Sequence, residues 1–180
     1  MKKFLLVSSL VAALSFPALA APYAIDVTNS KVGFSVKHIK ITKVDGVFKN
    51  FSANIDYDTA TKSFKTLEGE IDMTSVDTQN EKRDAHLQAS DMFDAQKFPK
   101  MFFKMTKYEA GKIYGDLTIK DVTKPVVLTS KETLKGNALE VSAQARIKRS
   151  EFGLEWGSVF KDNAVSDEVD ISLNLKANAQ

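Results

Sequence analysis

His38 and His86 are the only histidines of this 180-residue chain and its first candidates for acid–base or metal chemistry. A zinc site would use both with a carboxylate such as Asp84 or Asp91. Their separation of 48 residues matches no metal motif, and the chain has no cysteine to act as nucleophile or ligand. We therefore predict no catalytic residue, no metal and no cofactor. The alternative that stays open is an exported enzyme or metal-dependent protein that uses His38 and His86.

Arginine is scarce, with three arginines among the 25 basic residues. A guanidinium suits planar recognition of a carboxylate or a phosphate. Arg83 lies in a long connection between strand candidates, and Arg149 ends one of these candidates. Either could receive an anionic group, and the alternative for each is an ion pair or a solvated charge.

The first 20 residues have the three parts of a secretory signal peptide. Lys2 and Lys3 are the positive start, the range 4–16 is apolar, and Ala18-Leu19-Ala20 resembles a cleavage site. We predict a cleaved signal at 1–20 and a single domain at 21–180, and the absence of cysteine favours a bacterial periplasm. After cleavage 23 basic and 23 acidic residues remain, so a nucleic-acid partner is not expected. The apolar run is too short to span a membrane.

Apolar and polar residues alternate along most of the chain, which is typical of strands with one apolar face. Turn sequences such as Asp58–Lys62 and Lys135–Asn137 separate these runs, so neighbouring strands should pair antiparallel. The pattern predicts an all-β sandwich or barrel of about eight strands. The runs cover 32–37, 51–57, 67–73, 113–119, 139–147 and 169–176, with weaker candidates at 101–108 and 126–131.

One segment, 78–100, breaks the alternation. Thr78 and Glu81 have the spacing of a capping box, which predicts that Thr78 caps a short helix over 81–89. The helical insertion near 79–95 would cover one mouth of a barrel.

An eight-stranded barrel is either filled by side chains or holds one small ligand. Small residues at inward positions, Gly69 and Gly115 with Ala143 and Ala145, would leave space for a ligand. His38, Arg83 and His86 would then stand near a mouth and meet a polar head group. The apolar tunnel residues that we predict are Phe34, Val36, Phe51, Ile71, Phe93, Phe98, Phe102, Leu117, Val141, Trp156 and Phe160.

Alternation reads the same whether the apolar face points into a barrel or out toward lipid. An outer-membrane barrel is therefore a further alternative. The last strand ends without a terminal aromatic residue, and aromatic girdles are not evident, so a membrane-spanning protein is not expected.

Several short motifs follow one another in a fixed order along the chain. They are Phe34-x-Val36-x-His38, Val44-x-Gly46-x-Phe48, Arg83-Asp84-x-His86-Leu87, Asp91-x-Phe93-Asp94, Phe98-Pro99, Gly115-Asp116-Leu117-Thr118-Ile119, Thr123-Lys124-Pro125-Val126, Arg149-Ser150-Glu151-Phe152-Gly153 and Asp167-Glu168-Val169.

In their order and spacing, these motifs resemble the YceI-like family, bacterial periplasmic proteins with a lipocalin-like fold. The resemblance implies an extended antiparallel barrel of about eight strands. It implies binding, storage or transport of a long amphiphile, such as a polyisoprenoid, an isoprenoid quinone, or a fatty acid or fatty-acid amide, rather than catalysis. It also implies a homodimer. The chain departs from the family pattern at Met92, where an aromatic is common, and at Ser166, where glycine is common.

Overall fold

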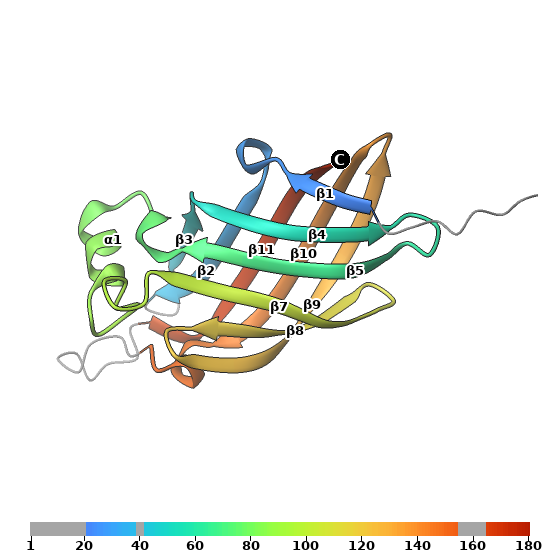
Figure 1. The fold of residues 1–180 in the computed structure, drawn as a ribbon. Helices are drawn as coiled ribbons and strands as arrows, with labels where there is room; N and C mark the ends of the chain where they lie inside the picture. Colours follow the sequence, from blue (N-terminus) through green and yellow to red (C-terminus); the bar gives the residue numbers. More distant parts are fainter. Residues whose placement is uncertain (1–20, 39–41, 155–164) are drawn as a thin grey trace, which may run out of the picture.

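The computed structural model describes residues 21–38, 42–154 and 165–180, which form one continuous antiparallel sheet with one short α-helix (Figure 1). Eight strands close into a barrel in the order β1-β4-β5-β7-β8-β9-β10-β11, and pairing of β1 with β11 completes the ring. This confirms the predicted all-β barrel. The ring strands are β1 (Ala21–Ile25), β4 (Phe51–Asp58), β5 (Ser63–Asp72), β7 (Lys100–Glu109), β8 (Lys112–Ile119), β9 (Val122–Lys135), β10 (Ala138–Lys148) and β11 (Val165–Ala179).

Three further strands extend the wall at one end of the barrel. β2 (Lys31–His38) pairs with β11, β3 (Thr42–Phe48) pairs with β2, and β6 (Val76–Asp77) pairs with β3. All eight alternating runs of the sequence are strands in the structure, whereas β1, β3 and β6 were not predicted. β1 and β6 are short, with five and two residues, and carry too few residues for a period to emerge.

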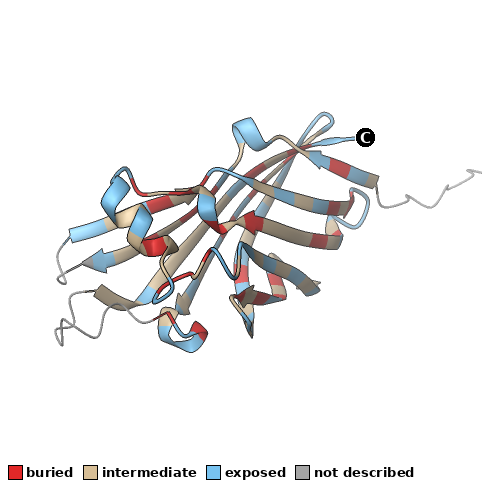
Figure 2. Ribbon diagram, turned by 60° about the vertical axis from the view of Figure 1, so that its left-hand side comes forward, coloured by how far each residue is buried: buried red, intermediate tan, exposed pale blue. Residues whose placement is uncertain are grey.

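The apolar face of the strands points into the barrel. Buried and exposed positions alternate along the strands (Figure 2), and Ile55, Ile113 and Leu139 are almost fully buried. Ion pairs such as Lys104 with Glu68 lie on the outer face. Among the described helices, none is long and apolar enough to cross a membrane.

The helix α1 (Glu81–Gln88) lies at the end of the barrel opposite to the β4–β5 and β7–β8 turns (Figure 1). It begins where it was predicted, but its N-cap is Asn80 rather than Thr78. The Asn80 side chain accepts a hydrogen bond from the backbone N–H of Arg83 at 3.0 Å. Thr78 is buried and donates instead to Asp84 at 2.5 Å. An extended backbone at Asn80 brings its side chain over the first turn, so the capping box does not form.

Candidate ligand-binding cavity

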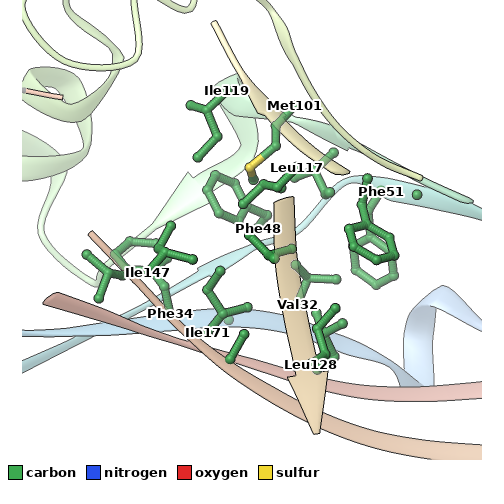
Figure 3. Close-up of a pocket in the computed structure, with 18 of the residues that line it drawn as sticks. Val32, Phe34, Phe48, Phe51, Met101, Leu117, Ile119, Leu128, Ile147 and Ile171 are labelled. Atoms are coloured by element: carbon green, nitrogen blue, oxygen red, sulfur yellow. The ribbon is translucent and has the colours of Figure 1, made fainter. Parts of the chain in front are cut away.

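A cavity of about 180 Å³ lies inside the barrel at the end near α1 (Figure 3). Residues of β2, β3, β4, β5, β7, β8, β9, β10 and β11 line it, together with Leu87, Met92 and Phe93 from the α1 segment, residues 81–98. An apolar cavity of about 150 Å³ is enough to stay dry and bind benzene. The space is therefore large enough for part of an apolar ligand before any rearrangement.

Small residues leave this space open. Ala53, Gly69 and Ala145 line the cavity, and a Cβ atom added at Gly69 would come no closer than 3.9 Å to its neighbours. The predictions for Gly115 and Ala143 need correction. A Cβ at Gly115 would lie 2.4 Å from the Phe103 ring, so that ring already fills the position, and Ala143 is buried beneath the cavity.

Aromatic side chains join the α1 segment to the barrel wall. The ring of Phe34 contacts Phe48 with centroids 5.7 Å apart, and Phe48 contacts Phe93 at 6.1 Å. Phe34 also covers Gly46 on the neighbouring strand, where a Cβ would clash at 2.3 Å. These contacts place Phe93, which is far from Phe34 in sequence, on the same cavity wall. The predicted tunnel residues that line the cavity are Phe34, Val36, Phe51, Ile71, Phe93 and Leu117.

Three predicted tunnel residues lie elsewhere. Phe102 is on the outer face of β7 with 45% of its surface exposed, and its neighbour Phe103 lines the cavity instead. Phe98 is outside the lining and contacts Lys97, whose Nζ lies 4.9 Å from the ring centroid. Val141 faces inward but is part of the packed core, 3% exposed. Trp156 and Phe160 lie outside the described residues.

The predicted head-group residues are not gathered at the cavity. Arg83 donates from Nε to the Thr78 hydroxyl and from Nη2 to the Thr78 carbonyl, both at 2.7 Å. His86 lies 3.1 Å from Asp91, and this hydrogen bond lowers the pKa of the Asp91 carboxyl. Neither side chain lines the cavity. His38 ends β2, where it is paired with Thr42, and its side chain lies outside the described part.

Among the described residues, the structure shows no metal-binding cluster that would support a site with the two histidines. No group of three His, Cys, Asp or Glu is placed to hold a metal ion among the side chains that the structure describes, which do not include that of His38. A role for the His38 and His86 pair stays an untested alternative.

Arg149, whose guanidinium makes it a candidate for binding an anionic group, lies at the cavity. It follows β10 and continues the inward phase of Ala145 and Ile147. Its guanidinium donates to the backbone carbonyls of Leu154 at 2.6 Å and Ser166 at 3.2 Å, with a longer contact to Val165 at 3.4 Å. These carbonyls orient the group without neutralising its charge. Glu68 and Ser52, which also border the cavity, are on strand positions of outward phase.

Comparison with known proteins identifies the family of the chain. The model of the YceI-like domain matches residues 23–177. Protein YceI of Escherichia coli O157:H7 is 30% identical over 171 residues, which cover 88% of this chain and 87% of that protein. Burkholderia cenocepacia BcnA has a similar structure, with a TM-score of 0.78, 28% identity and coverage of 86% of this chain and 99% of that chain.

A more distant structure shares the fold alone. A polyisoprenoid binding domain from Saccharophagus degradans superposes with a TM-score of 0.68 at 18% identity, covering 90% of this chain and 99% of that domain. The family model spans all eight strands of the ring and the cavity between them. This chain therefore belongs to the YceI-like family.

Proposed function

We propose that this protein binds a long-chain amphiphile in the barrel cavity, for storage or transport in the bacterial periplasm. The ligand classes are polyisoprenoids, isoprenoid quinones, and fatty acids or their amides. The observation that carries the proposal is the apolar cavity, which seven of the eight ring strands line together with β2 and β3. The polyisoprenoid binding domain of Saccharophagus degradans, which has the same fold, supports this class of ligand.

Burial of the apolar chain supplies the binding free energy. Removing several hundred Å² of hydrocarbon from water is worth on the order of 10 kcal/mol, before the costs of ordering are subtracted. The cavity wall offers almost no competing polar contact, because inward positions carry aliphatic and aromatic side chains. Binding by such a wall selects for hydrocarbon and leaves the head group to be recognised elsewhere.

We assign recognition of the head group to Arg149. Arg149 lines the cavity, and backbone carbonyls hold its guanidinium in a fixed orientation, so the group can meet an anionic or strongly polar head group without first rearranging. Its remaining N–H groups suit a phosphate or a carboxylate. Location in the periplasm rests on the signal-peptide pattern of residues 1–20.

Mass spectrometry of the purified protein tests binding most directly. We expect a co-purifying amphiphile at one molecule per chain under native conditions, released by solvent extraction. A protein that is empty and takes up no added prenyl or acyl lipid would contradict the proposal. The native spectrum also counts chains per particle and so tests the homodimer that the family resemblance implies.

A matched pair of variants assigns binding to the inner face. Phe34→Asp places a carboxylate on the cavity wall and should abolish lipid retention, because a charge in an apolar site is costly. Phe102→Asp makes the same change on the outer face and should retain lipid. Circular dichroism checks that both proteins fold. Equal lipid content in the two folded variants would contradict the assigned face.

Arg149→Gln tests the head-group assignment. This variant should weaken binding of a fatty acid by about tenfold, because a charge-assisted hydrogen bond is lost. The fatty alcohol of the same chain length should lose less, since it carries no charge. An equal loss for both ligands would mean that Arg149 acts only on the structure of the rim.

A further inference from the structure

The barrel interior has a sharp boundary between open space and filled core. Leu67, Leu128 and Leu175 line the cavity, and each is 8% exposed or less. The residue directly opposite each leucine on the neighbouring strand does not line the cavity and is almost fully buried. These pairs are Leu67 with Ile55, Leu128 with Ile113, and Leu175 with Val141.

The three leucines come from three different parts of the ring, β5, β9 and β11. We call them the leucine floor. Opposed residues of an antiparallel pair share one face of the sheet and lie side by side. In each of these three pairs, the leucine lines the cavity and the residue opposite it does not. The three pairs therefore mark the inner end of the cavity.

The core beyond the leucine floor is held in place by aromatic contacts and two hydrogen bonds. Phe64 packs edge-on against Tyr57 and Tyr108, with ring centroids 5.0 and 5.5 Å away. The Tyr108 hydroxyl donates to Glu132 at 2.9 Å, and Ser130 donates to the other oxygen of that carboxylate at 2.5 Å. A hydrocarbon chain that advanced past the floor would have to displace these rings and desolvate a carboxylate.

We infer that the leucine floor of Leu67, Leu128 and Leu175 sets the longest hydrocarbon chain that the cavity takes up in full. This inference rests on the proposed function and adds chain-length selection to it. Affinity should rise about fourfold for each methylene that enters the cavity, which corresponds to ~0.8 kcal/mol. It should stop rising once the chain end reaches the floor, because further methylenes stay outside in water.

Saturated fatty acids from about eight to about 22 carbons are the probes. Displacement of a fluorescent fatty acid gives a dissociation constant for each length. Wild-type protein should show a steady rise in affinity followed by a break. Leu128→Ala lengthens the cavity at the floor and should move the break to chains longer by about three carbons, the number of side-chain carbons removed.

Leu117→Ala is the matched control, since Leu117 has the same burial but faces the lining residue Phe103 on the cavity wall. It should change affinities at all lengths and leave the break in place. Leu175→Phe places a larger side chain at the floor and should move the break to shorter chains. This second variant keeps the test valid if Leu128→Ala does not fold. A wild-type break that neither floor variant moves, or a rise without a break, would overturn the inference while leaving lipid binding intact. Failure to bind any chain would overturn both.

Discussion

The two ends of the barrel differ although they share the same strands. At the end with the β4–β5 and β7–β8 turns, large side chains such as Tyr57, Phe64 and Tyr108 meet and fill the interior. At the end near α1, Ala53 and Gly69 stand opposite each other on the inner face and leave it open. Alternation is the same at both ends, so side-chain size decides which end is core and which is cavity. A filled end holds the ring closed, which lets the other end stay empty.

The largest difference between the two ends should be seen with isoleucine truncations. Ile113→Ala removes a fully buried side chain from the packed end and should lower the free energy of unfolding by about 3–4 kcal/mol. Ile171→Ala makes the same change on the cavity wall, where the side chain is only partly buried, and should cost about 1 kcal/mol. Urea denaturation measures both. Equal costs would mean that the cavity wall is as tightly packed as the core.

A pair of glycine substitutions should give effects of opposite sign. Gly115→Ala forces a Cβ to within 2.6 Å of the Lys104 carbonyl oxygen and against the Phe103 ring, and should destabilise by about 1–3 kcal/mol. Gly69→Ala meets only ordinary contacts and should stabilise by about 0.4–1 kcal/mol, because the unfolded chain loses conformational freedom. Thermal unfolding of the lipid-free proteins distinguishes them. Two destabilised variants would show that the space at Gly69 is needed for the fold itself.

The smallest expected effect is a change in the free energy of unfolding with pH, caused by the ionisation of Tyr108 at the packed end. Burial, together with the Glu132 carboxylate, raises the pKa of Tyr108 to about 12. The unfolded chain releases this proton near pH 10, so the free energy of unfolding should fall between about pH 10 and pH 12. Tyr108 is partly exposed, so we expect its share of this fall to be about 1 kcal/mol.

Tyr108→Phe isolates that share, because Phe cannot ionise while the other tyrosines remain. The difference in free energy of unfolding between wild type and variant should shrink as pH rises from 10 to 12. Urea titrations at fixed ionic strength provide the measurement. A difference that stays constant over this range would contradict the raised pKa of Tyr108.

Periodicity alone predicted much of the cavity wall. Phe34 and Val36 share one phase of β2, and both line the cavity together with Leu117 from another alternating run. The same reasoning failed at Phe102, because the neighbouring Phe103 is identical in type and the pattern there was weak. Pairing of β7 with β5 and β8 places Phe103 inward. Arg149 carried a usable signal, since it continues the inward phase of β10 past the end of the strand.

The sequence does not predict whether an inward-facing residue lies at the cavity or in the packed core. Val141 has the right phase for the tunnel, yet it is buried against Leu175 beneath the cavity. Likewise, nothing local to Arg83 predicts that its guanidinium donates hydrogen bonds to Thr78. Both outcomes depend on side chains supplied by other elements of the fold.

Eight of the strands, their apolar face, the short helix and the membership of the YceI-like family could be predicted from the sequence. These follow from local alternation and from ordered motifs. Where the barrel is filled and where it is open depends on the assembled fold. That depends on residues such as Tyr57, Phe64 and Tyr108, which lie on separate strands and meet only when the ring forms. A cavity is a property of what several distant side chains leave unoccupied, so no single stretch of sequence encodes it.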